Sequence, residues 1–298
     1  IVDYGNCRIE EFTPDGIYVD KFGSFGYGNG QFQYPYGMAI NSSGYFYIAD
    51  TSNNVVQVFD PDKNFLFQWG GFYWPEGIAT APNGNVYVVD TNNNQVQLFD
   101  SSGTFITAWG SYGTAGEGAF NYPYGIALDT AGNVYVTDTS NHRVQKFNES
   151  GTYLGEWGQQ GSGDSDLWFP EGIALDKNNR VYVGDSWNGR VQVFTDEGDP
   201  VTRFGSLGMG NGQFENIYGV SVAGDGSVYV VDVADDRIQK FSFVPPAAAD
   251  MVGVYRPSIH TFILKNGTEK TIVPWGLSTD IPVAGDWNGD GLSDVGVY

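Results

Sequence analysis

The chain has 298 residues, of which 35 are Asp or Glu and 14 are Lys or Arg, so its net charge is −21. Such an acidic surface repels phosphate backbones and argues against nucleic acid as a partner. A single cysteine, Cys7, excludes an internal disulfide. No apolar run approaches the roughly 20 residues that a membrane-spanning helix needs. Gly (42 residues) and aromatics (16%) are abundant, a composition that suits many short strands joined by tight turns.

A ten-residue pattern that begins with Asp and ends with Phe organises the chain. Its cleanest copy spans residues 138–147. The successive Asp residues are 47, 40, 48, 47 and 47 positions apart, and they are Asp3, Asp50, Asp90, Asp138, Asp185 and Asp232. A period of this length, with an Asp closing one strand and a short polar turn before the next, indicates a β-propeller.

Each full repeat predicts four strands. In the fourth copy these are residues 123–129, 133–138, 143–147 and 153–158, separated by Gly-, Asn- and Ser-rich turns of hairpin length. The first strand of each repeat carries small residues, which suit the crowded inner edge of a blade. The fourth ends in an aromatic residue such as Trp109, which we expect to cover the outer side of the blade.

This pattern resembles the NHL repeat over residues 1–244, and the resemblance implies a six-bladed all-β propeller. The Arg that the family carries in the pattern corresponds to Arg8, Arg143, Arg190 and Arg237, whereas Val55 and Gln95 depart from it. We expect the arginines to bridge neighbouring blades to carboxylates. RNA binding, as in proteins that combine TRIM and NHL regions, conflicts with the acidic charge.

The two ends of the repeat array are incomplete. The first copy lacks its first strand, and Pro245 and Pro246 interrupt the fourth strand of the last copy. Unpaired strand edges must be covered, so we expect another segment to pair with them. That segment would come from a longer natural chain or from a neighbouring copy, and self-assembly into a fibre is one consequence.

A Pro/Ala linker at 245–249 leads to a different unit at 250–298. Its oxygen-bearing side chains stand at places 1, 3, 5 and 9 of a loop, and a backbone carbonyl stands at place 7, which is the ligand spacing of a calcium site. The expected Ca²⁺ ligands are Asp286, Asn288, Asp290, the Leu292 carbonyl and Asp294. The unit resembles part of an FG-GAP or VCBS-type repeat of bacterial and archaeal surface proteins, which implies a small, incomplete β repeat.

The sequence offers little catalytic machinery. Its two histidines, His142 and His260, are interpreted as exposed bystanders, and Cys7 as a free thiol without a role. Propeller lyases related to this fold use several histidines around a metal. The alternative function is a hydrolase or lyase with a metal at the central channel. The carboxylates that could form such a site are those of Asp50, Asp90, Asp138, Asp185 and Asp232.

Three glycosylation sequons, at Asn41, Asn148 and Asn266, fall in predicted turns. Together these features predict a non-enzymatic structural or binding module of a larger repeat protein. We expect an extracellular or cell-surface location in a bacterium or archaeon, and a protein partner (another copy or a surface protein) or a glycan.

Overall fold

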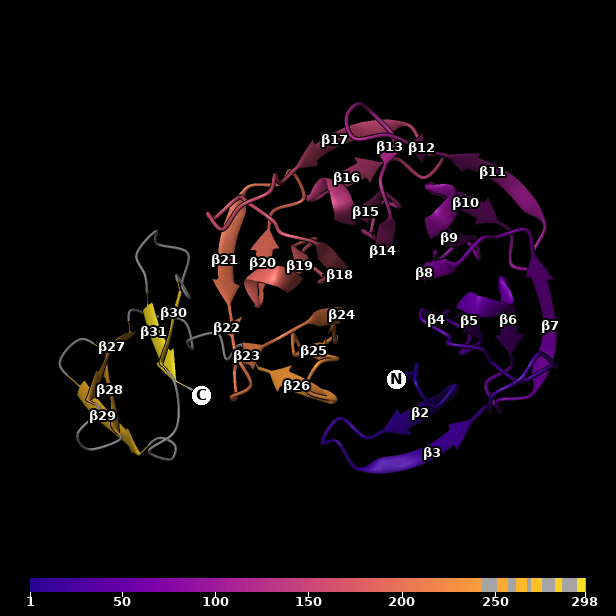
Figure 1. Ribbon diagram of the computed structural model, residues 1–298. Helices are drawn as coiled ribbons and strands as arrows, with labels where there is room; N and C mark the ends of the chain where they lie inside the picture. Colours follow the sequence, from indigo (N-terminus) through magenta and orange to yellow (C-terminus); the bar gives the residue numbers. More distant parts are fainter. Residues whose placement is uncertain (243–250, 257–260, 267–268, 275–281, 286–293, 298) are drawn as a thin grey trace. The chain divides into compact units, whose positions relative to one another are not determined.

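The computed structural model describes residues 1–242, 251–256, 261–266, 269–274, 282–285 and 294–297. The fold is an all-β six-bladed propeller (Figure 1). The chain divides into two compact units. The first contains residues 1–160 and 169–173, and the second contains residues 161–168 and 174–298. Within the described residues no helix is both long and apolar enough to cross a membrane.

The first four blades are antiparallel meanders. Blade one contains β1 (Val2–Asp3), β2 (Arg8–Phe12) and β3 (Tyr18–Phe22). Blade two contains β4 (Met38–Ile40), β5 (Phe46–Asp50), β6 (Val55–Phe59) and β7 (Phe65–Gly70). Blade three contains β8 (Pro75–Thr80), β9 (Val86–Asp90), β10 (Gln95–Phe99) and β11 (Phe105–Trp109). Blade four contains β14 (Pro123–Leu128), β15 (Val134–Asp138), β16 (Arg143–Phe147) and β17 (Tyr153–Trp157).

Two further blades follow. Blade five contains β18 (Pro170–Leu175), β19 (Val181–Asp185), β20 (Arg190–Phe194) and β21 (Pro200–Phe204). Blade six contains β24 (Ile217–Val222), β25 (Val228–Asp232) and β26 (Arg237–Phe241). The last strands are β27 (Met251–Arg256), β28 (Thr261–Asn266), β29 (Glu269–Pro274), β30 (Pro282–Gly285) and β31 (Asp294–Val297).

Short elements occupy the links between strands. One-turn 3₁₀ helices join the second and third strands of blades two to five: η1 (Thr51–Asn53), η2 (Thr91–Asn93), η3 (Thr139–Asn141) and η4 (Ser186–Asn188). Two inter-blade loops contain parallel two-residue ladders, β12 (Ser111–Tyr112) with β13 (Ala119–Phe120), and β22 (Ser206–Leu207) with β23 (Gln213–Phe214). The repeat pattern predicted turns and loops here, because stretches this short carry no strand or helix periodicity.

The strand predictions for the fourth repeat are confirmed to within one residue at each end. The three-stranded first blade also agrees with the expected absence of its first strand. The predicted interruption at Pro245 and Pro246 lies outside the described residues. The calcium loop lies outside the described residues, apart from Asp294, where β31 begins. The calcium site therefore stays a prediction.

Glycine is required on the inner strands because the blades converge there. A Cβ on Gly77 would lie 2.2 Å from the Tyr124 carbonyl oxygen of the next blade, and one on Gly125 would lie 2.3 Å from the Glu171 carbonyl oxygen. No side chain fits at such separations. The expectation of small residues at the inner edge is thus confirmed. The close approach of the inner strands also sets the position of the residue just before each glycine.

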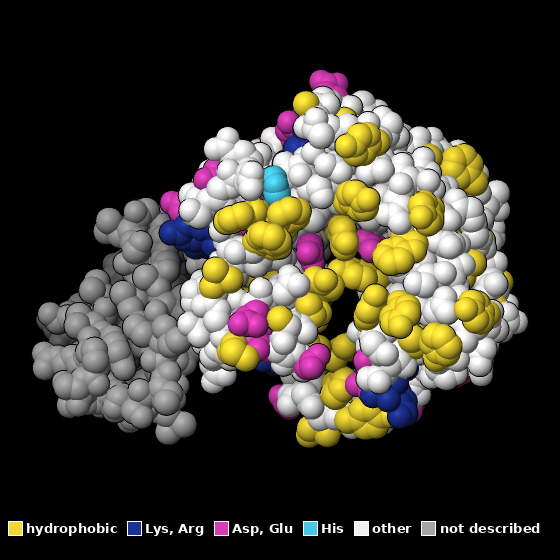
Figure 2. All heavy atoms as spheres, in the orientation of Figure 1, with side chains coloured by type: hydrophobic (Ala, Val, Ile, Leu, Met, Phe, Trp, Pro, Cys, Tyr) yellow, Lys and Arg dark blue, Asp and Glu magenta, His cyan; other side chains and the backbone are white. Residues whose placement is uncertain are grey.

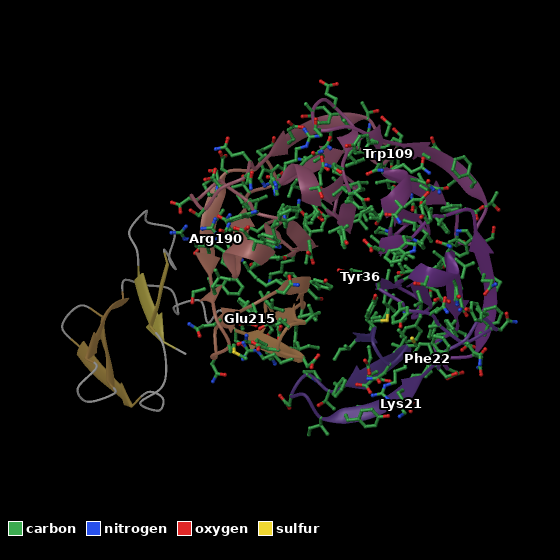
Figure 3. The ribbon with its side chains drawn as sticks, in the orientation of Figure 1. Lys21, Phe22, Tyr36, Trp109, Arg190 and Glu215 are labelled. Atoms are coloured by element: carbon green, nitrogen blue, oxygen red, sulfur yellow. The ribbon has the colours of Figure 1, made fainter. Side chains whose placement is uncertain are left out.

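The tryptophans at the ends of the fourth strands lie between blades and do not simply cover the outer side of their own blade. Trp109 of blade three packs against Phe147 of blade four, with ring centroids 5.9 Å apart. Its indole leaves no room for a Cβ on Gly151, in the next blade's hairpin turn. Figure 3 shows Trp109 toward the outer edge of its blade. The prediction placed these rings on the correct edge but missed that they join adjacent blades.

Candidate functional site

Each repeated Asp is the centre of a buried hydrogen-bond cluster. Asp138 is fully buried. Its carboxylate accepts hydrogen bonds from the Asn121 backbone N–H at 2.7 Å, from Arg143 Nε at 2.7 Å and from Gln145 Nε2 at 3.0 Å. The Asn121 donor belongs to the loop that enters the blade, and the Arg143 and Gln145 donors belong to the third strand. One carboxylate therefore holds these segments together. Asp50, Asp90 and Asp185 make the same kinds of contact within their own repeats.

This arrangement changes two interpretations of the motif. Arg143 pairs with Asp138 of its own blade and donates to the Ala119 carbonyl of the preceding loop at 2.6 Å. The expectation that the arginines bridge to carboxylates of neighbouring blades is therefore wrong in its geometry. Gln95 stands where other repeats have Arg, and its Nε2 donates to Asp90 at 2.8 Å. The replacement of Arg by Gln therefore keeps the hydrogen bond to the repeated Asp.

The repeated carboxylates are not available to a substrate or a metal. Asp50, Asp90, Asp138, Asp185 and Asp232 are all fully buried. Their oxygens already accept several hydrogen bonds, so a structural role accounts for their recurrence. Within the described residues, no group of three or more His, Cys, Asp or Glu side chains is placed to hold a metal ion.

The first unit has two unlike faces. We call one of them the loop face: it consists of residues 24–36, 51–54, 71–76, 91–94, 111–124, 139–142 and 169–171, where fourth strands connect to first strands and second strands turn into third strands. Its exposed aromatic residues are Phe25, Tyr27, Tyr34, Tyr73, Trp74, Tyr112 and Tyr122.

The turns of the opposite face of this unit are poor in aromatics, although Tyr18 and Phe105 are exposed at the strand ends beside them. These turns, at residues 13–17, 41–45, 60–64, 81–85, 100–104, 129–133 and 148–152, contain one aromatic residue, Tyr45. In Figure 2, hydrophobic side chains gather over the first unit on the face in view, with Asp and Glu side chains among them. Exposed aromatic clusters of this kind mark interaction surfaces.

Four aromatic residues of the loop face have left-handed backbone conformations. Each stands directly before a proline, and they are Tyr34 (φ 50°), Trp74 (φ 58°), Tyr122 (φ 49°) and Phe169 (φ 49°). A bulky residue at positive φ is strained, by about 1–3 kcal/mol, whereas Gly and Asn adopt this region readily. The turns of the same blades do use Asn54, Asn94 and Gly189 at positive φ. Because Asn or Gly would adopt this backbone conformation with less strain, the aromatic side chains at these four positions serve a purpose besides folding.

The preceding blade holds each strained residue in place. The backbone N–H of Trp74 donates to Asn54 Oδ1 at 2.8 Å, and that of Tyr122 donates to Asn94 Oδ1 at 2.9 Å. In the equivalent contacts the acceptors are Cys7 Sγ for Tyr34 (3.4 Å) and His142 Nδ1 for Phe169 (3.1 Å).

These contacts correct the sequence interpretation of Cys7 and His142. Cys7 is buried, with 3% of its surface exposed, and His142 also packs edge-on against the Phe169 ring at 4.6 Å. Both residues therefore position an aromatic residue of the loop face and are not bystanders. The signal was present in the sequence, since both occupy the position filled by Asn in other repeats, but it required knowing which loop lies opposite the turn.

A second group of residues lies at the start of the inner strands. The residue just before the crowded glycine alternates between aromatic and acidic along the chain: Tyr36, Glu76, Tyr124, Glu171 and Tyr218. The rings of Tyr36 and Tyr124, from blades two and four, meet edge to face with centroids 5.7 Å apart. Figure 3 shows Tyr36 at the inner edge of its blade. The sequence analysis missed this alternation because only the fold brings these positions together.

The two glutamates are strongly perturbed. Glu76 is 3% exposed, and burial raises its pKa to about 8 against the hydrogen bond with Thr91. Burial, followed by the negative charge of Glu76, raises the pKa of Glu171 to about 8. Glu171 Oε2 is buried and has no hydrogen-bond partner. Desolvation disfavours the charged carboxylate, so burial favours the protonated form of each group.

Hydrogen-bond geometry at Thr91 leads to the same conclusion. Thr91 Oγ1 lies 3.0 Å from Glu76 Oε2 and 2.9 Å from the Pro123 carbonyl oxygen. In neighbouring blades the equivalent hydroxyls donate to the next blade's carbonyl, Thr51 to Pro75 and Thr139 to Pro170. A hydroxyl has one proton. If Thr91 uses it on the carbonyl as its counterparts do, the proton in the contact with Glu76 must come from the carboxyl group.

Two of the three predicted sequons lie in tight turns of the first unit. Asn41 Oδ1 accepts the backbone N–H groups of Ser43 and Tyr45, and Asn148 Oδ1 accepts those of Ser150 and Thr152. Asn266 is the last residue of β28. Glycosylation at the three sites stays a prediction.

Comparison with known proteins identifies the repeat. The NHL repeat matches residues 32–59, 72–99, 120–147 and 167–194, so the chain carries four NHL repeats. It is 46% identical over 54 residues to the brain tumor protein of Drosophila melanogaster and 50% identical over 52 residues to the B-box type zinc finger protein ncl-1 of Caenorhabditis elegans. It is 44% identical over 50 residues to the E3 ubiquitin-protein ligase TRIM71 of Rattus norvegicus. These matches cover 17–18% of the chain and only 5–6% of the relatives.

Solved structures share the fold at low sequence identity. A catalytically inactive virginiamycin B lyase from Staphylococcus aureus, determined with quinupristin, has a TM-score of 0.58 at 15% identity, covering 90% of this chain and 87% of the lyase. A chain of a nidogen/laminin complex has a TM-score of 0.54 at 15% identity, covering 82% of this chain and 81% of that one. At such identities the likeness concerns the fold alone.

The relatives overturn the expected location. The brain tumor protein, ncl-1 and TRIM71 are intracellular proteins, so the prediction of an extracellular or cell-surface location is wrong. That prediction relied on the resemblance of residues 250–298 to surface-protein repeats and on the acidic charge, and acidic charge does not distinguish compartments.

Proposed function

We propose that this propeller with four NHL repeats is a non-enzymatic protein-interaction module that binds its partner through the loop face of the first unit. The observation that carries the proposal is the unequal distribution of aromatic side chains. The loop face exposes seven large aromatic residues, whereas the turns of the opposite face contain only Tyr45. NHL propellers mediate protein interactions, which agrees with this assignment.

The strained backbone supports the same surface. Tyr34, Trp74 and Tyr122 keep 42%, 42% and 48% of their surface exposed at positive φ, so a large part of each strained side chain is available to a partner. Aromatic side chains supply large, rigid contact areas and are enriched where binding energy concentrates. A residue that costs folding energy and remains exposed fits a role in binding.

The alternative, a hydrolase or lyase with a metal at the central channel, has less support. The repeated carboxylates proposed for it are buried and already hydrogen-bonded. The fold is shared with lyases, but a common fold does not transfer a reaction. Self-assembly into a fibre and binding of a glycan remain predictions.

Selection of peptides tests the proposed function. A phage-displayed library of random 12-residue peptides is panned on the intact chain, and the affinities of the selected peptides are measured by biolayer interferometry. We expect Trp74→Asn to weaken binding at least tenfold, while Tyr45→Ser on the opposite face leaves it unchanged. Asn suits the left-handed conformation, so loss of binding would not reflect misfolding. Selected peptides that are insensitive to Trp74→Asn and sensitive to Tyr45→Ser would contradict the proposal.

A further inference from the structure

The charges of the loop face restrict its partner. Its loops and turns contain three acidic residues, Glu76, Glu117 and Glu171, and neither Lys nor Arg. The whole chain has a net charge of −21. A surface that exposes aromatic rings and carries no Lys or Arg, on a chain of this net charge, attracts cations by long-range electrostatics and by cation–π contacts. The same charges repel a phosphate backbone.

Glu76 and Glu171 provide a specific place for a cation. They occupy the same position on the inner strands of blades three and five, and Tyr36 and Tyr124 occupy it on blades two and four. Tyr4 of blade one belongs to this group, because its ring lies 6.2 Å from that of Tyr36 and its phenol feels the charge of Glu76. The two carboxyls are thus electrostatically coupled to each other, and Glu76 also to the Tyr4 phenol.

The carboxyl pair is incompletely hydrogen-bonded. Glu171 Oε2 is buried without a hydrogen-bond partner, although a buried unpaired acceptor costs about 1–3 kcal/mol. Glu171 as a residue is half-buried, so part of it lies at the surface although Oε2 itself is buried. Glu76 is 3% exposed, and its Oε2 lies within hydrogen-bond distance of the Thr91 hydroxyl. A donor with several N–H groups would satisfy the pair.

We infer that the loop face binds a basic segment of a partner protein, one of whose Arg or Lys side chains is held by Glu171 and Glu76 against the rings of Tyr36 and Tyr124. This inference rests on the proposed function and adds the chemistry of the partner. A bound cation favours the carboxylates over the carboxylic acids. The O–H bonds of the two acids therefore break on binding, and the protons pass to the solvent. Binding is tighter at higher pH, and it releases protons.

Calorimetry with defined peptides tests this inference on the intact chain. The probe is a peptide of alternating Arg and Gly, and its control has citrulline, which is uncharged and of similar shape, in place of each Arg. We expect the Arg peptide to bind at least tenfold more tightly than the citrulline peptide. Its binding heat at pH 7 should depend on the ionisation enthalpy of the buffer, because protons are released.

Variants locate the effect. Glu171→Gln combined with Glu76→Gln should weaken the Arg peptide at least tenfold and abolish the buffer dependence. Glu117→Gln, an exposed acid of the same face, should change the affinity less than twofold. Equal loss in the Glu117 variant would show a general charge effect and overturn the assignment to the pair.

Other outcomes separate the inference from the proposed function. Equal binding of the two peptides, with loss on Trp74→Asn and no effect of the glutamate variants, would refute the cation site while supporting the loop face as a binding surface. Failure of the Arg peptide to bind would also refute the basic partner. A single-stranded RNA oligonucleotide that binds more tightly than the Arg peptide at physiological salt would overturn both.

Discussion

Replacement of Glu76 by Gln should make the protein more stable at neutral and alkaline pH. The pKa of Glu76 is about 8 in the folded protein, against an ordinary value of 4.5. Between these values the folded protein holds a proton that the unfolded chain has released, so the free energy of unfolding falls as the pH rises. The penalty is absent below about pH 4.5 and reaches about 5 kcal/mol above pH 8, at about 1.4 kcal/mol per pH unit.

Gln reproduces the shape and the donor of the protonated carboxyl without titrating. Its amide nitrogen can donate to Thr91 Oγ1, as a protonated carboxyl would, and its amide oxygen can accept from the same hydroxyl. At pH 7.5 the variant should therefore be up to about 4 kcal/mol more stable than the parent chain, and at pH 5.0 the two should differ by less than about 1 kcal/mol. Because Glu171 feels the charge of Glu76, its own titration should also move to lower pH in the variant.

Urea denaturation followed by tryptophan fluorescence, at half-unit steps from pH 5.0 to 8.5, measures this difference. The exposed Glu117→Gln variant is the matched control, and its stability should follow that of the parent chain at every pH. Parallel pH profiles for the parent chain and the Glu76 variant would show that Glu76 is ionised in the folded protein. They would refute the argument from the single Thr91 proton as well.

Four further results are expected. Asp138→Asn should cost about 1.5–3 kcal/mol in urea denaturation, because it removes the buried charge-assisted hydrogen bond from Arg143 Nε while Glu156 still pairs with the guanidinium; a loss below 1 kcal/mol would contradict this. Gly77→Ala should cost about 1–3 kcal/mol through the clash 2.2 Å from the neighbouring carbonyl, whereas Gly155→Ala, with no atom within 4 Å of its Cβ position, should cost less than about 1 kcal/mol. Trp74→Asn should raise the unfolding free energy by about 1 kcal/mol through relief of the left-handed strain, and a fall in stability would refute the strain. Calorimetry of the full chain should show one Ca²⁺ bound at residues 286–294, and the absence of heat at millimolar calcium would count against that loop.

The sequence was sufficient to predict the blades. Six copies of one pattern gave the period, the propeller class and the strand bounds. In the fourth repeat the third strand, 143–147, begins and ends where predicted. These features depend on residues close together in the chain, where alternation and turn chemistry act locally. The role of Asp138 as a structural centre was also predictable in outline, since six-fold recurrence is typical of a scaffold.

The binding features required the tertiary structure, because they depend on which blades meet. Cys7 and His142 each hold a residue 27 positions away, and nothing local to either residue indicates its partner. Glu76 and Glu171 are 95 residues apart, and only convergence of the inner strands brings their charges within reach of each other. The sequence thus determined the repeated unit. The packing of one unit on the next decided which carboxylates are structural and which keep their protons, because burial and neighbouring charge act through space.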